Sequence, residues 1–251
     1  MSASEELIYL RGQIRDARAA AIRDAEAFTE VLFAVERLGS YLYRAVGSLS
    51  KYQGKINKLA GNSPLAKEVP AAHPQAHIPF NRLYETVMRA RNDALHQGAY
   101  ARHLTSRVIE LTIVLEDALM SSFTTVGEYM VRNPISASLW QPLSFVRQQM
   151  LANSFSYLPV LGPGSHWCFV SDLDLARYLR AKAEVRRDRI AETLRDAVAS
   201  GGLSLSPAKV VSPGETVESV AAKLDHLPII ITLDGQPSGE LIGILTAFDL
   251  L

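Results

Sequence analysis

The stretch RARNDALHQG, residues 89–98, brings together three residue types that act on phosphate esters: Arg91, Asn92 and His96. Histidine titrates near neutral pH and can take or give a proton, while the planar arginine fork can hold phosphate oxygens. On a helix Asn92 and His96 share a face, whereas Arg91 is rotated away. Such a set could cleave RNA without a metal, through the ribose 2′-hydroxyl. The alternative is that His96 is a partly buried histidine that is hydrogen-bonded within a helical bundle.

A second set of polar residues occurs twice, each time where an apolar run ends. Ser171 is followed by Asp174, and Thr246 by Asp249. A strand that delivers a hydroxyl to the start of a helix makes an anion site with the free N–H groups of that helix. The aspartate three residues on can accept hydrogen bonds from ribose hydroxyls. The alternative is that each pair only caps its helix, as these residue types commonly do.

The composition limits which ligands, metal sites and cellular locations we expect for this chain. The chain has 26 Lys and Arg and 26 Asp and Glu residues, so a polyanion would have to meet a local basic patch. Its single cysteine, Cys168, excludes an internal disulfide and a cysteine-based zinc site. His73 and His77 flank Pro74, which prevents a helix between them, so we expect no metal site. We find no secretory signal and no apolar run long enough for a membrane helix, and we expect a cytoplasmic protein without a membrane partner.

The elements that must position these residues fall into two parts. Residues 4–59 have helical spacing and predict two helices, with breaks at glycines. Pro64, Pro70, Pro74 and Pro79 then predict a loop. The helical pattern resumes with Asn81 as N-cap and, after Gly98, continues to about residue 122. The first half is therefore expected to be an all-α bundle of four or five helices, in residues 1–122.

From residue 124 onward short strands alternate with helices, and the order repeats. We predict a helix over 142–152, strands over 157–160 and 167–171, and a helix opened by Asp172. The segment SYLPVL…FVSDLDL is matched later by HLPIII…LIGILTAFDL. Two copies of one unit are thus expected, at 123–182 and 203–251, joined by a charged helical connector at 183–202.

The repeated segments resemble a tandem pair of CBS domains, which are βαββα modules that often bind adenosine nucleotides. The resemblance implies a fold that is multidomain, α and α+β, with the CBS pair following the bundle. The second copy stops at Leu251, where its last helix should run, and Cys168 stands where the first copy's strand usually has glycine. The ligand that the resemblance implies is AMP, ADP or ATP. Ser171 and Thr246 would then face its phosphate, and Asp174 and Asp249 its ribose. The backbone around Pro159, Val160, Pro228 and Ile229 would face the base.

The first half resembles the HEPN superfamily of small helical bundles, because RNDALHQG precedes a long apolar last helix. In ribonuclease members an Arg, a polar residue and a His, here Arg91, Asn92 and His96, are catalytic and need no cofactor. Those members dimerise, so that two such sets form one cleft. Arg82, Arg89, Arg102, His103 and Arg107 would line it. Toxin members carry a tyrosine two residues after the His; here Gly98 stands there.

Together the two resemblances imply a dimeric, metal-independent RNA endonuclease regulated by an adenosine nucleotide, with RNA as substrate. An antitoxin or another regulatory partner is a further expectation from the toxin members. The alternative is a non-catalytic nucleotide-sensing regulator, whose helical part serves dimerisation or partner docking. A groove in which Arg91 and His96 of two chains meet would favour the enzyme.

Overall fold

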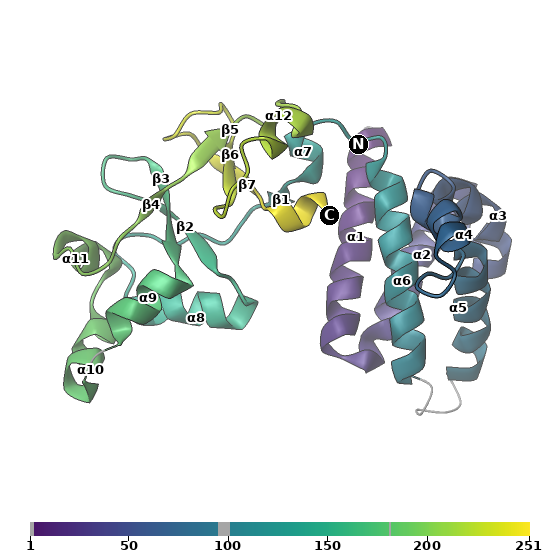
Figure 1. Cartoon of the computed structure of the whole chain (residues 1–251), viewed down its shortest axis with the longest axis horizontal. Coiled ribbons are helices and arrows are strands. Elements are labelled where there is room, and N and C mark those ends of the chain that lie inside the picture. Colours follow the sequence, from purple (N-terminus) through teal and green to yellow (C-terminus); the bar gives the residue numbers. More distant parts are fainter. Residues whose placement is uncertain (1–2, 95–100, 181) are drawn as a thin grey trace. The chain divides into compact units, whose positions relative to one another are not determined.

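The computed structural model describes residues 3–94, 101–180 and 182–251. The chain divides into two compact units, Met1–Phe123 and Thr124–Leu251, which we call the helical unit and the strand-containing unit (Figure 1). Since each has its own hydrophobic core, each is described by itself.

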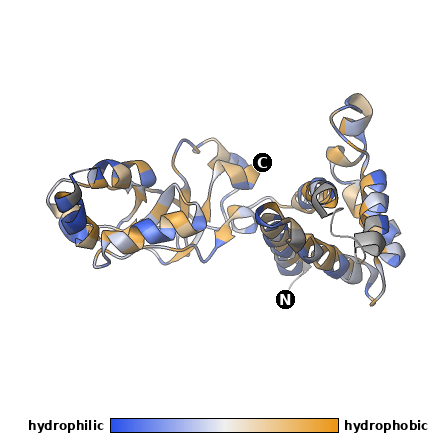
Figure 2. Cartoon of the chain, turned by 90° about the horizontal axis from the view of Figure 1, so that it is seen from below, coloured by the Kyte–Doolittle hydropathy of each residue, from blue (hydrophilic) through white to orange (hydrophobic). Residues whose placement is uncertain are grey.

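The helical unit contains five long α-helices, a short one and the 3₁₀ helices η1 (Ala25–Ala27) and η2 (Pro64–Ala66) among its described residues. The α-helices are α1 (Ala3–Arg23), α2 (Phe28–Tyr43), α3 (Leu49–Ala60), α4 (Glu68–Ala72), α5 (Phe80–Ala94) and α6 (Ala101–Met120). The predicted helix-rich character of this part is confirmed. In Figure 2 its helices show hydrophobic and hydrophilic residues along the same ribbons, as expected for helices that bury one face.

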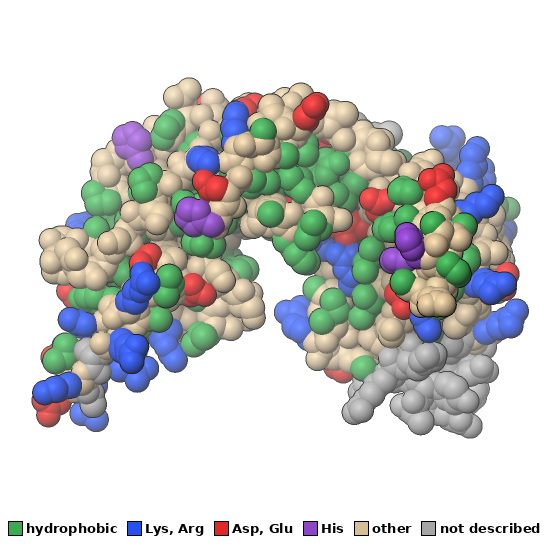
Figure 3. Space-filling model, viewed as in Figure 1, with side chains coloured by type: hydrophobic (Ala, Val, Ile, Leu, Met, Phe, Trp, Pro, Cys, Tyr) green, Lys and Arg blue, Asp and Glu red, His purple; other side chains and the backbone are tan. Residues whose placement is uncertain are grey.

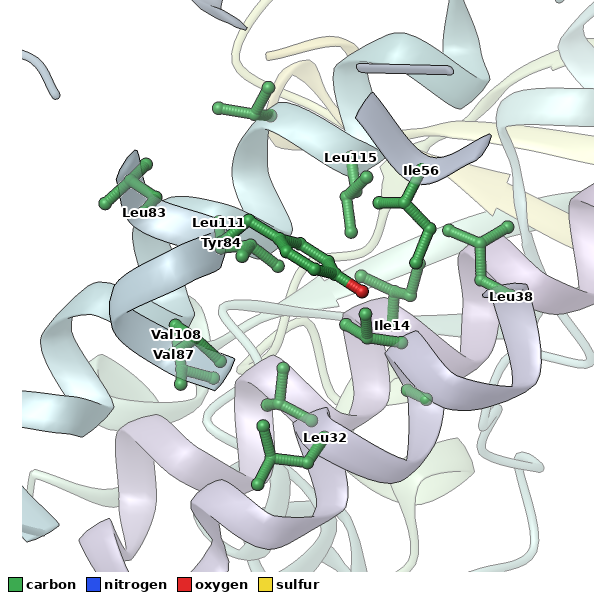
Figure 4. Close-up of a cluster of buried hydrophobic side chains, with 14 of the residues drawn as sticks. Ile14, Leu32, Leu38, Ile56, Leu83, Tyr84, Val87, Val108, Leu111 and Leu115 are labelled. Atoms are coloured by element: carbon green, nitrogen blue, oxygen red, sulfur yellow. The ribbon is translucent and has the colours of Figure 1, made fainter. Parts of the chain in front are cut away.

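The core of the helical unit forms from residues at helical spacing. Leu111 and Leu115 of α6 are fully buried, as are Ile14 of α1 and Ile56 of α3, and these side chains gather around Tyr84 in Figure 4. The Tyr84 hydroxyl donates to the carbonyl of Leu49 over 2.7 Å, and burial raises the pKa of this phenol above its usual range. This bond ties α5 to the start of α3.

An ion-pair group lies between α1 and α6 in the helical unit. Glu116 pairs with Arg11, whose Nε lies 3.4 Å from Oε1, and with Arg18 through Oε2. The side chain of Arg11 is 6% exposed and that of Glu116 is 10% exposed. Two arginines on one carboxylate compensate the cost of burying the charges.

Three expectations for this half were wrong in detail. Residues 4–59 form three helices instead of two, because the 3₁₀ helix Ala25–Ala27 separates α1 from α2. Helix α2 then ends at Arg44, which adopts the left-handed conformation with φ of 57°. The proline-rich segment contains α4, since Pro70 lies in its first turn, where no helical N–H is needed. Helix α5 begins at Phe80, and the carbonyl of Pro79 accepts from the amides of Arg82 and Leu83, so Asn81 is not the N-cap.

The strand-containing unit holds two copies with a similar order of elements. The first copy has α7 (Val126–Tyr129), β1 (Val131–Arg132), α8 (Leu143–Asn153), β2 (Tyr157–Leu161), β3 (Trp167–Ser171) and α9 (Asp172–Leu179). After α10 (Ala183–Ala191), the second has α11 (Leu194–Ala199), β4 (Ser206–Pro207), β5 (Lys209–Val211), α12 (Val217–Ala221), β6 (Ile229–Thr232), β7 (Leu241–Leu245) and the 3₁₀ helix η4 (Ala247–Leu250).

The two copies exchange their first strands. One sheet has the order β1-β7-β6-β5 and the other β2-β3-β4. Strand β1 of the first copy pairs antiparallel with β7, with Val131 opposite Ile244, and β4 pairs antiparallel with β3, with Cys168 opposite Pro207. Each sheet is thus completed by a strand from the other copy.

The short helices before these strands are exchanged as well. Leu194 and Ala197 of α11 pack in the core with α8 of the first copy, while Val126 of α7 packs in the core of the second. Backbone bonds hold this arrangement: the amide of Leu194 donates to Gln141 and that of Val126 to Glu215, both over 2.9 Å. The segment that we expected to be a connector therefore supplies α11 to the first copy's core.

Candidate functional site

Thr246 and Asp249 of the second copy form a closed hydrogen-bonded turn where β7 ends. The Thr246 hydroxyl donates to Oδ2 of Asp249 over 2.8 Å, and the Thr246 amide donates to the same oxygen over 2.7 Å. Asp249 is only 3% exposed. The pair is a capping box for η4, so the capping alternative describes the geometry of the second copy.

Ser171 and Asp174 take the equivalent place at the junction of β3 and α9. The Ser171 hydroxyl donates to Oδ2 of Asp174 over 2.6 Å and accepts from the Asp174 amide over 3.0 Å. Ser171 is buried and Asp174 is half-buried. Oδ1 of Asp174 makes no hydrogen bond in the described part of the chain, which leaves that oxygen able to accept one from a ligand hydroxyl.

The residues predicted to lie around the base are buried, and all but Pro228 are in the sheets. Pro159 and Val160 lie on β2, opposite Phe169 and Cys168 of β3. Pro228 precedes β6, and Ile229 pairs with strands on both sides. The carbonyl of Pro159 accepts from the amide of Ala137 over 2.8 Å. The backbone of Pro159, Val160 and Ile229 already takes part in pairing, and each residue lies in the same copy as its Ser/Thr and Asp pair.

Trp167, which the motif analysis did not single out, links the two copies. Its indole N–H donates to the carbonyl of Gly239 over 2.8 Å, and its amide donates to the carbonyl of Pro237 over 2.9 Å. Its own carbonyl accepts from the amide of Ala208 over 3.1 Å. The start of β3 is therefore bonded to the β6–β7 hairpin. The signal available in the sequence was a tryptophan at a strand start and a glycine-rich hairpin in the other copy.

Two of the three residues Arg91, Asn92 and His96 lie in the last turns of α5. Arg91 and Asn92 belong to the helix, but their side chains and the whole of His96 lie outside the described residues. Whether the three side chains meet is therefore a prediction that the geometry does not address. The same holds for the side chains of Arg102 and His103.

Two of the other cations expected near this set already have carboxylate partners. Nη2 of Arg89 lies 3.7 Å from Glu85, and Nη1 of Arg107 lies 2.8 Å from Glu110. Arg82 is exposed and lines a cleft of about 960 Å³ next to α5. Lys67, His77 and Arg107 also line this cleft, and its described lining contains no Asp or Glu.

Comparisons with known proteins identify the second copy. The family model described as CBS domain matches residues 201–251, so this segment is a CBS domain. No curated protein sequence matched the chain. Among the described helices, none is long and apolar enough to cross a membrane.

Solved structures with a similar fold cover about half of the chain. A CBS domain-containing protein of unknown function from Bacillus anthracis is 15% identical over 50% of this chain and 88% of its own, with a TM-score of 0.39. The CBS-pair protein CBSX2 from Arabidopsis thaliana is 19% identical over 50% and 90%, with a TM-score of 0.36. CBSX2 has also been solved in complex with AMP.

Proposed function

We propose that this chain is a regulatory protein whose CBS pair binds an adenosine nucleotide and whose helical unit serves dimerisation or partner docking. The observation that carries the proposal is the duplicated hydroxyl and carboxylate pair at a strand-to-helix junction, within a unit whose second copy is a CBS domain. Ser171 and Thr246 would face phosphate, and Asp174 and Asp249 would face ribose. The backbone around Pro159, Val160, Pro228 and Ile229 would contact the base.

The exchanged strands support a role for nucleotide binding in regulation. A ligand held by one copy contacts a sheet completed by the other, so binding can shift the balance between two arrangements of the copies. Trp167 lies at this junction and would carry part of the coupling. Coupling of this kind requires that the ligand bind one arrangement more tightly than the other.

Thermal unfolding followed by tryptophan fluorescence tests the class of ligand. Both tryptophans of the chain, Trp140 and Trp167, lie in the strand-containing unit, so their signal reports this unit. AMP, ADP or ATP at about 100 times its Kd should stabilise the unit by about 2.7 kcal/mol. GMP and GTP serve as matched controls. No shift with any adenosine nucleotide, or equal shifts with guanosine nucleotides, would contradict the proposal.

A second candidate function is a metal-independent ribonuclease of HEPN type, which the Arg91, Asn92 and His96 pattern favours. In this proposal the helical unit is a HEPN-like bundle, two chains form the composite cleft, and RNA is the substrate. His96 would transfer the proton and Arg91 would hold the phosphate. An antitoxin partner is expected only if the chain is a ribonuclease of this type.

Incubation of the purified chain with total cellular RNA, without divalent metal, tests the second candidate. The controls are His96→Ala and Arg91→Ala variants whose fold has been checked by circular dichroism. Cleavage that disappears in both variants would establish the ribonuclease. Absence of cleavage with and without AMP or ATP would reject it, and undiminished cleavage in the variants would indicate a contaminant.

A further inference from the structure

A segment of dense positive charge runs from the end of α9 through α10. Residues 177–189 hold six of the 26 Lys and Arg residues and only two of the 26 Asp and Glu residues. The segment therefore carries a net charge of +4, and the remainder of the chain carries −4. In Figure 3 its Lys and Arg side chains gather at the lower left of the view, over α10. The neutral total conceals this separation of charge.

Most of these cations are exposed and unpaired. Their side chains extend from the last turn of α9, the segment after it and α10, and none of the five has an ion-pair or hydrogen-bond partner in the part of the chain that the structure describes. They are Arg177, Arg180, Lys182, Arg186 and Arg187. Since no carboxylate neutralises them, their charges face solvent and are available to a partner.

The sixth cation, Arg189, has a different role. Its Nη1 donates to the carbonyl of Tyr178 over 2.5 Å, and its guanidinium lies 4.6 Å from the centroid of the Tyr178 ring. The Tyr178 hydroxyl donates in turn to Glu192. These contacts hold α10 against the end of α9. They therefore fix the position of the helix that carries the exposed Arg186 and Arg187.

The composition of α10 indicates what kind of partner fits. A helix that lies on a membrane needs an apolar face, and a protein interface needs an apolar centre. Val185, which is 44% exposed, is the single exposed large hydrophobic residue of α10. A phosphodiester backbone, by contrast, requires only accessible cations, and arginine forks suit its oxygens.

We propose that these five exposed cations, in residues 177–180 and 182–187, bind the phosphodiester backbone of a nucleic-acid strand without reading its bases. This site is separate from the adenosine-nucleotide site and does not rest on the proposed function. Because the contacts are ionic, each neutralised phosphate releases counterions and affinity falls with salt. With five available cations, the slope of log K against log salt for a single strand should reach about −3.5.

Fluorescence anisotropy of the full chain tests this, with oligo-uridine and oligo-thymidine probes of about 20 nucleotides at about 50 to 200 mM KCl. We expect the two probes to bind within about threefold of each other, since the shared backbone is the ligand. The Arg186→Gln/Arg187→Gln variant should have a slope less negative by about 1.4, because two phosphate contacts are lost. DNA lacks the 2′-hydroxyl, so its result is independent of any ribonuclease activity.

The matched control is Arg23→Gln/Arg44→Gln, which removes two exposed arginines from the helical unit. It should bind like the wild type. The proposal is overturned if neither probe binds, if both double variants lose affinity equally, or if Arg186→Gln/Arg187→Gln leaves the slope unchanged. Binding to phosphatidylserine vesicles in the absence of nucleic-acid binding would also overturn it and assign the segment to a lipid surface.

Discussion

Thr246 and Asp249 bond to each other so that one carboxylate oxygen accepts both the Thr246 amide, at 2.7 Å, and the Thr246 hydroxyl, at 2.8 Å. Ser171 and Asp174 repeat the hydroxyl-to-carboxylate bond at 2.6 Å in the first copy. The pair therefore fixes each junction before any ligand arrives. Each hydroxyl has a single hydrogen, so a phosphate that accepts it must displace the aspartate oxygen. The backbone amide bonds of Thr246 and Asp174 can keep each cap in place while that exchange occurs.

The cap at Ser171 should contribute measurably to stability. Ser171→Ala removes the acceptor for the Asp174 amide, and we expect a loss of about 1 kcal/mol in the free energy of unfolding. Urea unfolding followed by tryptophan fluorescence measures it. Ser204→Ala is the control, because Ser204 is exposed and should change stability by less than about 0.5 kcal/mol. Equal effects of the two substitutions would contradict the cap.

The buried ion-pair group should be far more sensitive than a surface pair. Glu116→Gln leaves Arg11 and Arg18 without their shared anion, so we expect a loss of about 3 kcal/mol. Glu110→Gln, which breaks the pair of Glu110 with Arg107, is the matched control and should cost less than about 1 kcal/mol. Thermal unfolding followed at 222 nm compares them; a loss below 1 kcal/mol for Glu116→Gln would refute the account of this core.

Two glycines of the helical unit should respond to alanine in opposite directions. A Cβ at Gly39 would overlap the ring of Tyr52, so Gly39→Ala should destabilise by about 1 to 3 kcal/mol. A Cβ at Gly54 would meet nothing within 4 Å, and Gly54→Ala should stabilise by up to about 1 kcal/mol through helix propensity. Thermal unfolding followed by circular dichroism measures the change in stability of each variant. Similar shifts for both variants would show that α2 and α3 do not approach closely at Gly39.

Acid should weaken the second copy through Glu215. The hydrogen bond from Lys223, with Nζ 2.9 Å from Oε2, lowers the pKa of Glu215 below its usual 4.5. A lowered folded-state pKa gives stability that is present above the unfolded pKa and is lost as pH falls through the folded one. The difference in stability between wild type and Glu215→Gln should therefore shrink below about pH 4.5.

Urea unfolding at a series of pH values checks the prediction for Glu215. The exposed Glu218 offers a matched Glu→Gln control on the adjacent helix α12. If the difference between wild type and Glu215→Gln is constant with pH, Glu215 has no linked proton.

Local signals in the sequence located the junction of β3 and α9 well. The apolar run up to Ser171, followed by a helix opened by Asp172, matches the observed elements. The exchange of β1 and β4 could not be predicted, because each strand is two residues long and its pairing partner lies far away in sequence. The end of α2 depends on Arg44 in a left-handed conformation, for which a non-glycine residue gives little signal.

Calorimetric titration of the full chain with AMP and ATP tests the central claim most directly. The account predicts binding by the wild type, and an affinity about tenfold or more lower in Thr246→Val, which keeps the shape of residue 246 but removes its hydroxyl. Asp249→Asn, checked for fold, should weaken binding as well. No binding of either nucleotide by the wild type, or undiminished affinity in both variants, would contradict the claim that these pairs form a nucleotide site.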